Sequence, residues 1–179
     1  MGQTMKIGNI MLTENEIKER VAQLGAEISR DYGEEEVIVL GVLKGCFVFM
    51  SDLVRKLECD TRVYFMEISS YSDDTVSSGK INIKKDLDVD IEGKNVLIAE
   101  DIIDSGNTLC QLTAILKERK PKSLKVCTLL SKPSRRQVEF EADYTGFVIE
   151  DKFIIGYGLD CAERFRQLPY IAEVELYDE

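Results

Sequence analysis

The stretch Val96–Leu109 reads VLIAEDIIDSGNTL and decides the fold. It begins inside the apolar run Asn95–Ala99, which is typical of a strand buried on both faces, as in a parallel sheet. A polar loop, Asp104–Thr108, follows the strand. Apolar residues then recur at helical spacing up to Pro121 and predict a helix: Leu109, Leu112, Ile115 and Leu116. The stretch is therefore a strand, a loop and a helix in succession.

The loop between this strand and this helix has the composition of an anion site. Backbone amides converge at a helix N-terminus, where the helix dipole adds partial positive charge. Gly106 lets the backbone approach a ligand closely, and Ser105 and Thr108 add hydroxyl donors. The pattern GxxxxGK[ST] of nucleoside-triphosphate loops is absent, so the loop predicts a site for a monophosphate.

Three carboxylates stand beside this loop, at Glu100, Asp101 and Asp104. They follow a strand at the carboxyl edge of the predicted sheet, where open α/β folds bind ligands. Acids in such a place suit ribose hydroxyls, a Mg²⁺-bound sugar or a proton-transfer role. A solvated strand end with an N-cap aspartate is the alternative interpretation.

Further strands and helices alternate along the chain. A capping box at Thr13–Glu16 starts a predicted helix over 14–31, which Gly33 ends. Other elements are expected as strands at 37–43, 62–68, 124–130, 145–149 and 171–176, and a helix at 46–57. The alternation predicts an α/β fold with a mostly parallel central sheet flanked by helices, in a single domain over 1–179.

Residues 69–93 differ from this pattern, because they are polar and poor in core-forming side chains. We expect a long exposed excursion with a short hairpin around Lys80–Lys85. Long loops in compact domains often act as lids, and a surface insertion is the alternative.

Composition excludes several classes of function. The 179 residues carry a net charge of −10 and no histidine, which excludes Ser-His-Asp machinery and histidine-bound zinc. The acidic balance opposes a nucleic-acid surface. The sequence contains no apolar run of 18 residues, so it predicts no membrane span. Its five cysteines include no CxxC pair. We therefore expect reduced thiols and a cytoplasmic protein without nucleic-acid or membrane partners.

The stretch VLIAEDIIDSGNTL closely resembles the phosphoribosyl pyrophosphate motif of type I phosphoribosyltransferases: an apolar strand, two acids, two apolar residues and Asp-Ser/Thr-Gly-x-Thr. The resemblance covers nearly the whole chain, in the family's order, and is nearest to the bacterial hypoxanthine(-guanine) enzymes. The further segments that carry it are Gly41–Gly45, Ser70-Tyr71, Lys132, Asp151–Asp160 and Arg164–Arg166. It implies the family's fold, with a small hood and a mobile lid loop at about 69–93.

The resemblance implies a phosphoribosyl pyrophosphate site. The residues that it assigns there are Lys44, Gly45, Glu100, Asp101, Asp104, Ser105, Gly106, Asn107, Thr108 and Arg166. Lys44 and Gly45 would bind the pyrophosphate, partly by backbone, next to a cis peptide that is frequent in the family. Glu100 and Asp101 would hold the ribose hydroxyls and a first Mg²⁺, and Asp160 would ligate a second.

The resemblance also implies a purine site formed by Lys132, Phe153, Ile154 and Asp160. Phe153 would stack on the base, and Ile154 would contribute backbone hydrogen bonds. Lys132 would donate to the oxygen at C6 and so disfavour adenine. Asp104 would accept the N7 proton as N9 attacks the sugar, and a lid carrying Ser70 and Tyr71 would exclude water.

The implied function is Mg²⁺-dependent purine salvage: hypoxanthine or guanine and phosphoribosyl pyrophosphate give IMP or GMP and pyrophosphate. Two alternatives stay open, a xanthine-preferring enzyme and an RNA-binding regulator on the same fold, which the net charge opposes. The family also forms homo-oligomers, so we expect a dimer or a tetramer.

Overall fold

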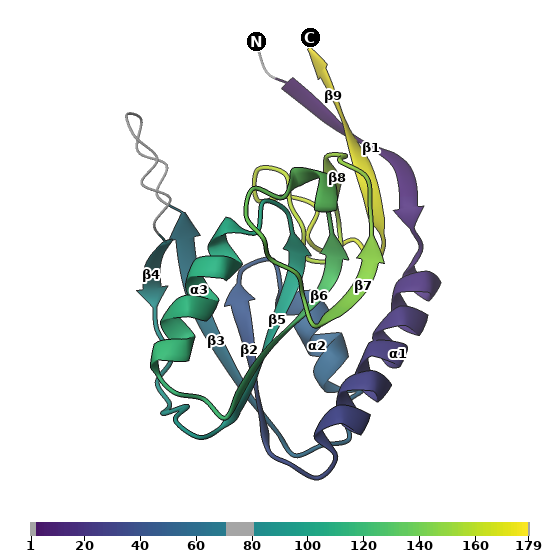
Figure 1. Cartoon of the computed structure of the whole chain (residues 1–179). Helices are drawn as coiled ribbons and strands as arrows, with labels where there is room; N and C mark the ends of the chain where they lie inside the picture. The colour runs from purple at the N-terminus through teal and green to yellow at the C-terminus, as the bar shows by residue number, and fades with distance from the viewer. Residues whose placement is uncertain (1–2, 71–80, 179) are drawn as a thin grey trace.

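The computed structural model describes residues 3–70 and 81–178 and places a six-stranded sheet at the centre of the molecule (Figure 1). Its order is β4-β3-β2-β5-β6-β7, and every pair is parallel except β3 with β4. The strands are β2 (Val37–Leu43), β3 (Thr61–Ser70), β4 (Ile81–Lys85), β5 (Asn95–Ile103), β6 (Ser123–Ser131) and β7 (Tyr144–Val148). The predicted mostly parallel α/β fold is confirmed.

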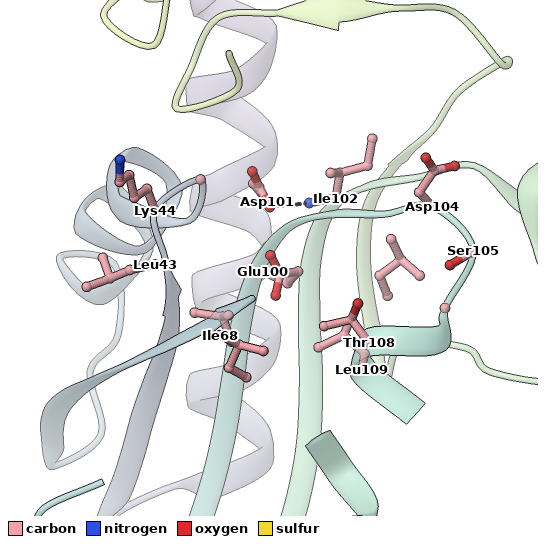
Figure 2. Close-up of a pocket in the computed structure, with 14 residues that line it drawn as sticks. Leu43, Lys44, Ile68, Glu100, Asp101, Ile102, Asp104, Ser105, Thr108 and Leu109 are labelled. Atoms are coloured by element: carbon pink, nitrogen blue, oxygen red, sulfur yellow. Dashed lines mark hydrogen bonds between the residues drawn. The ribbon is translucent and has the colours of Figure 1, made fainter. Parts of the chain in front are cut away.

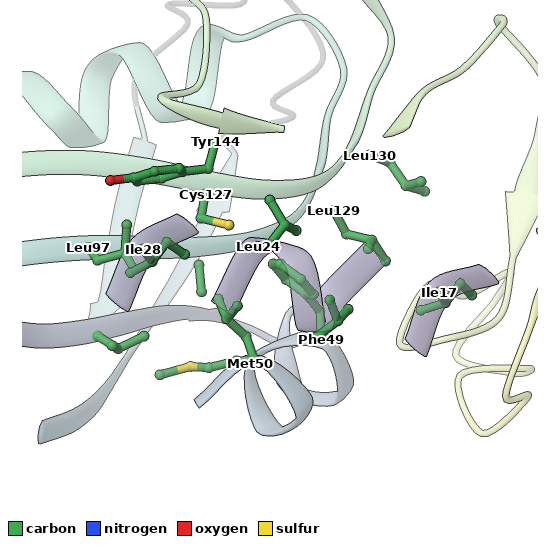
Figure 3. Close-up of a cluster of buried hydrophobic side chains, with 14 of the residues drawn as sticks. Ile17, Leu24, Ile28, Phe49, Met50, Leu97, Cys127, Leu129, Leu130 and Tyr144 are labelled. Carbon is green, nitrogen blue, oxygen red and sulfur yellow. The ribbon is translucent and has the colours of Figure 1, made fainter. Parts of the chain in front are cut away.

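Helices cover both faces of this sheet. The helices are α1 (Glu14–Tyr32), α2 (Phe47–Val54) and α3 (Asn107–Glu118), and a 3-10 turn, η1, spans Pro133–Arg135. Along β2, Val37 and Val39 belong to the core under α1 and α2, whereas Ile38 and Leu40 belong to the core under α3. Figure 3 shows the first of these cores between the two helices and the sheet. Burying each such side chain contributes about 2 kcal/mol.

The capping box predicted at the start of α1 is confirmed. The amide of Thr13 donates to Glu16 Oε2 at 2.8 Å, and the amide of Glu16 donates to Thr13 Oγ1 at 3.3 Å. Gly33 ends the helix with a φ of +58°, which favours glycine. Among the described helices, none has the length and apolarity that crossing a membrane requires.

A second, three-stranded sheet lies above the carboxyl ends of the central strands (Figure 1). It consists of β1 (Gln3–Leu12), β9 (Ile171–Asp178) and β8 (Ile154–Ile155), all antiparallel. The expectation that 171–176 completes the central sheet is therefore wrong, because β9 pairs with β1 from the other end of the chain. Sequence patterns did not identify β1, whose partner lies more than 150 residues away. This sheet is in the position of the expected hood.

Two further expectations need correction. Of the predicted excursion 69–93, residues 71–80 lie outside the described part. Most side chains of 81–93 are exposed, as expected, and β4 forms where the short hairpin was expected, but the segment also contributes to the core. β4 extends the central sheet, and Ile91 is buried in the core under α3. The helix expected over 46–57 ends at Val54, because 55–57 continue as hydrogen-bonded turns in which Leu57 still packs on the core.

Candidate active site

The candidate site is a cavity of about 290 Å³ at the carboxyl ends of β2 and β5 (Figure 2). Parallel strands end at the same edge of the sheet, so loops distant in sequence meet there. The residues lining the cavity are Val42, Leu43, Lys44, Gly45, Ile68, Glu100, Asp101, Ile102, Ile103, Asp104, Ser105, Gly106, Thr108 and Leu109. Most of the residues predicted to bind phosphoribosyl pyrophosphate are thereby brought together.

The loop between β5 and α3 forms one wall of this cavity. Gly106 is the N-cap of α3 and has a φ of +83°, a left-handed conformation that other residues rarely adopt. Ser105 Oγ accepts a hydrogen bond from the Asn107 amide at 3.3 Å. In Figure 2, Ser105 and Thr108 lie at the start of the helix, on the side of the cavity opposite Lys44. A helix N-terminus with these hydroxyls has the chemistry of an anion site.

Glu100 and Asp101 form the acidic part of the cavity. Asp101 is only 6% exposed, and its Oδ1 accepts a hydrogen bond from the Ile102 amide at 2.9 Å. Burial, followed by the neighbouring charge of Asp101, raises the pKa of Glu100 well above its ordinary value. Two neighbouring carboxylates in one cavity favour binding of a cation or of hydroxyl donors.

The loop after β2 closes the cavity on the other side. The Leu43–Lys44 peptide bond is cis, as the resemblance led us to expect. Lys44 is largely exposed, and its Nζ contacts Glu163 Oε2 at 3.0 Å. A Cβ at Gly158 would come within 2.2 Å of the Gly45 carbonyl oxygen, so the chain around Gly158 packs directly against this loop.

Asp160 and Arg166 contact each other, at 2.9 Å between Arg166 Nη2 and Asp160 Oδ1. Arg166 Nη1 also donates to the Gly158 carbonyl at 2.8 Å. Neither residue lines the cavity between β2 and β5; Arg166 lines a second cavity, of about 540 Å³, beside α1 and α2. The structure therefore does not place Asp160 and Arg166 in the same cavity as the other residues predicted to bind phosphoribosyl pyrophosphate and metal.

The predicted purine residues lie near the cavity without lining it. Lys132 follows β6 and is 6% exposed, and its Nζ donates to the Lys152 carbonyl at 2.6 Å. That bond fixes the lysine to the segment carrying Phe153, which is 57% exposed, and Ile154, which is buried in β8. An exposed aromatic side chain, on the segment whose carbonyl holds a buried lysine, has the chemistry of a base-stacking surface.

Asp104, the predicted general base, has an ion-pair partner that sequence reasoning did not identify. Arg135 Nε lies 3.1 Å from Asp104 Oδ1, and its Nη1 lies 3.4 Å from Asp151 Oδ2. Arg136 and Gln137 were also missed, although they donate to the Asp104 and Ser105 carbonyls of the loop between β5 and α3. The available signal was the basic pair Arg135-Arg136 in SKPSRR, which by sequence is an ordinary basic loop.

Of the two expected lid residues, Ser70 is the last residue of β3, two positions after the cavity-lining Ile68, and Tyr71 lies outside the described residues.

Within the described ranges, no three acidic, histidine or cysteine side chains are grouped closely enough to enclose a metal ion. Glu100 and Asp101 nevertheless fit a Mg²⁺ ion that takes its other ligands from water and substrate phosphates, the usual arrangement for this cation.

Comparison with known proteins defines the class. Residues 10–162 match the model of the phosphoribosyl transferase domain. The chain belongs to the phosphoribosyltransferase family, in agreement with the loop and acid pair described above.

Its relatives place it more narrowly. The hypoxanthine phosphoribosyltransferase of Salmonella typhimurium is 49% identical over 172 residues, which cover 95% of this chain and 97% of that protein. A crystal structure of a hypoxanthine-guanine phosphoribosyltransferase from Bacillus anthracis, with HEPES in its active site, matches with a TM-score of 0.91. That match has 47% identity and covers 96% of this chain and 99% of the other.

Another relative is much longer. The bifunctional protein TilS/HprT of Listeria monocytogenes is 48% identical over 175 residues, covering 97% of this chain. The chain spans only 27% of the length of that protein.

Proposed function

We propose that this chain transfers the 5-phosphoribosyl group from phosphoribosyl pyrophosphate to N9 of hypoxanthine or guanine, giving IMP or GMP and pyrophosphate. The observation that carries the proposal is the single cavity lined both by Glu100 and Asp101 and by residues of the loop Asp104–Thr108. An anion site beside buried acids suits a ribose 5-phosphate, which offers phosphate to one wall and hydroxyls to the other. The relatives named for this activity support the choice of base.

In this proposal the loop Asp104–Thr108 binds the 5′-phosphate through amides and hydroxyls, and Asn107 contributes its amide. Glu100 and Asp101 accept hydrogen bonds from the ribose hydroxyls. Lys44, the backbone of Gly45 and Arg166 bind the pyrophosphate. The contacts of Lys44 and Arg166 with Glu163 support this role, because ion pairs between partly exposed side chains are weak and exchange readily for a phosphate.

We propose Mg²⁺ as the metal, held by Glu100 and Asp101 at one position and by Asp160 at a second. When bound, it would offset the negative charge of the leaving pyrophosphate. The oxygen-only donor set supports a hard cation.

For the base, we propose that the purine stacks on Phe153, that Ile154 supplies backbone hydrogen bonds and that Asp160 completes this subsite. Lys132 donates to the oxygen at C6. The hydrogen bond from Lys132 Nζ to the Lys152 carbonyl supports that role, because it limits the directions in which the ammonium can point. Asp104 accepts the proton from N7, and Arg135 keeps its carboxylate oriented.

We further propose that the chain is one domain over 1–179 with a lid at about 69–93, in which Ser70 and Tyr71 exclude water from the reacting sugar. The position of Ser70 at the end of β3, near the cavity, supports this placement. Residues 81–93, which β4 and the buried Ile91 attach to the central sheet, would serve as the fixed base of the lid.

Product formation with hypoxanthine, guanine, xanthine, adenine and uracil in turn tests the proposal. We expect turnover with hypoxanthine or guanine, abolished by a chelator and restored by Mg²⁺. Preference for xanthine would favour the alternative enzyme, and turnover of adenine or uracil alone would refute the assignment. Tight, salt-sensitive RNA binding without turnover would favour the regulator.

A homo-oligomer, dimer or tetramer, is also proposed. This proposal rests on the resemblance to the family, whose members form dimers and tetramers. A mass measured in solution by light scattering tests it, and a monomer at micromolar concentration would refute it. We propose a cytoplasmic location, which the five free thiols support.

A further inference from the structure

The side chain of Arg136 is among the most completely bonded in the described structure. It is 10% exposed, yet its nearest carboxylate, Glu141 Oε2, lies 3.9 Å away. Oxygens of the backbone and of a serine satisfy it instead. Arg136 Nη1 donates to the carbonyls of Ile103 and Asp104 at 2.8 and 2.6 Å, Nη2 to Ser131 Oγ at 2.7 Å, and Nε to the Phe140 carbonyl at 3.0 Å.

Two of these bonds, to the carbonyls of Ile103 and Asp104, reach the start of the loop that we propose binds the 5′-phosphate. The next carbonyl, that of Ser105, accepts from the Gln137 amide at 2.9 Å, and Asn107 Nδ2 donates to Gln137 Oε1 at 2.6 Å. A Cβ at Gly106 would come within 3.3 Å of Arg136 Cδ. The segment Arg136–Phe140 therefore supports the loop from the side that does not line the cavity.

The direction of the carbonyls sets the direction of the amides. In a planar trans peptide, the C=O and the following N–H point in opposite directions. Because Arg136 holds the carbonyl of Asp104, the amide of Ser105 points away from Arg136. Gln137 acts in the same way through the Ser105 carbonyl, so the Gly106 amide also points away from the segment. Both amides belong to residues that line the cavity.

The same support reaches the proposed base site. The Ile103 carbonyl accepts from Arg136 and also from the Lys132 amide, at 2.9 Å. Lys132 and Arg136 lie at the two ends of one short turn, η1. A shift of the loop on phosphate binding would therefore also move the backbone of Lys132.

We infer that Arg136 is a positioning residue for the reaction: its guanidinium fixes the amides of the 5′-phosphate loop and links that loop to the turn carrying Lys132. The inference rests on the proposed function, because it takes the loop Asp104–Thr108 as the phosphate site. A lysine offers a single ammonium and cannot make this fan of bonds, so the role is specific to arginine.

Arg136→Lys and Arg136→Gln test it, with Arg20→Lys and Arg20→Gln as matched controls. Arg20 also donates to two backbone carbonyls, those of Gly146 and Thr145, but these lie on β7, away from the cavity. The measurements are melting temperature, the KM values of both substrates, and binding of IMP and of inosine by calorimetry. The ratio of the two affinities isolates the contribution of the 5′-phosphate.

We expect both Arg136 variants to weaken IMP binding and raise the KM of phosphoribosyl pyrophosphate roughly tenfold or more, with inosine binding changed much less. The Arg20 variants should lower the melting temperature and leave the IMP-to-inosine ratio unchanged. An unchanged ratio in folded Arg136 variants, or an equal fall in the Arg20 variants, would overturn the inference. If both Arg136 variants fail to fold while the Arg20 variants fold, the role of Arg136 is stabilisation of the fold and the inference is also overturned.

The wild-type chain separates these failures from a failure of the proposed function. A wild-type chain that binds IMP no more tightly than inosine refutes the phosphate site itself. A wild-type chain that discriminates, with variants that discriminate equally well, refutes only the role of Arg136.

Discussion

Gly45 lies so close to Asp101 that a Cβ at position 45 would come within 1.9 Å of Asp101 Oδ2. The loop after β2 and the acidic end of β5 are therefore packed together so closely that a side chain at position 45 is excluded. Gly45→Ala must displace the Asp101 carboxylate or the loop. We expect a loss of about 1–3 kcal/mol in the free energy of unfolding and a clear rise in the KM of phosphoribosyl pyrophosphate.

Gly93→Ala is the control for this substitution. Gly93 has a φ of +69° with nothing within 4 Å of its added Cβ, so only backbone strain is introduced there. We expect about 1 kcal/mol of destabilisation and unchanged kinetic constants. If Gly45→Ala behaves in the same way, Asp101 does not contribute to substrate binding.

Asp104→Asn should lower kcat by roughly 10²–10⁴-fold, because an amide cannot accept the purine proton. The KM of phosphoribosyl pyrophosphate should change little, since the loop amides are retained. Steady-state kinetics at saturating substrate measure the effect. Asp86→Asn, which removes an ion pair with Arg119 far from the cavity, is the control. Retention of normal kcat would remove Asp104 as the base.

Lys132→Ala should reduce the preference for 6-oxopurines. The wild-type ammonium is held by the Lys152 carbonyl, and an adenine amino group facing it would be a donor against a donor. We expect kcat/KM for hypoxanthine to fall more than tenfold while that for adenine falls much less. The control is Lys152→Ala, which removes only an exposed pair with Glu173 and keeps the carbonyl. Undiminished discrimination in Lys132→Ala would refute the role.

Tyr144→Phe should destabilise the fold in a pH-dependent way. Tyr144 Oη donates to Asp31 Oδ2 at 2.6 Å, and this bond lowers the pKa of Asp31 below its ordinary 3.8. That stability is present above pH 3.8 and is lost as the pH falls through the folded pKa. Burial, followed by the bond to Asp31, raises the pKa of Tyr144 above its ordinary 10.0. Above pH 10, Tyr144 therefore loses its proton more easily in the unfolded state than in the folded state, and the wild type loses stability.

The substitution removes both effects. We expect Tyr144→Phe to cost about 1 kcal/mol of unfolding free energy between pH 4 and 10. The cost is this small because Asp31 is partly exposed and the bond is screened. It should shrink below pH 4 and above pH 10, where the wild type itself loses the stability. Urea unfolding at several pH values measures it. Asp31→Asn should reproduce the acid side of the profile. A cost that is the same at pH 3 and pH 7 would contradict the prediction.

Local sequence was enough to predict most of the central sheet and its helices. β-branched runs such as Val37–Leu43 favour a strand covered on both faces, and the capping box at Thr13 marks where α1 begins. The prediction found β9 as a strand but assigned it to the central sheet, and it missed β1, because the pairing of the two chain ends leaves no local signal. The prediction of an exposed segment was also wrong for Ile91, which is buried although its neighbours in the sequence are polar.

For the candidate site, the sequence alone determined the loop Asp104–Thr108 and the acids Glu100 and Asp101, because these residues are contiguous and their chemistry depends on a strand meeting a helix. Only the tertiary structure placed Gly45 against Asp101, Arg135 on Asp104 and Arg136 beneath the loop. Those contacts join residues that are 31 to 56 positions apart. They arise because parallel strands bring their carboxyl ends to one edge of the sheet, and no local pattern encodes which loops will meet there.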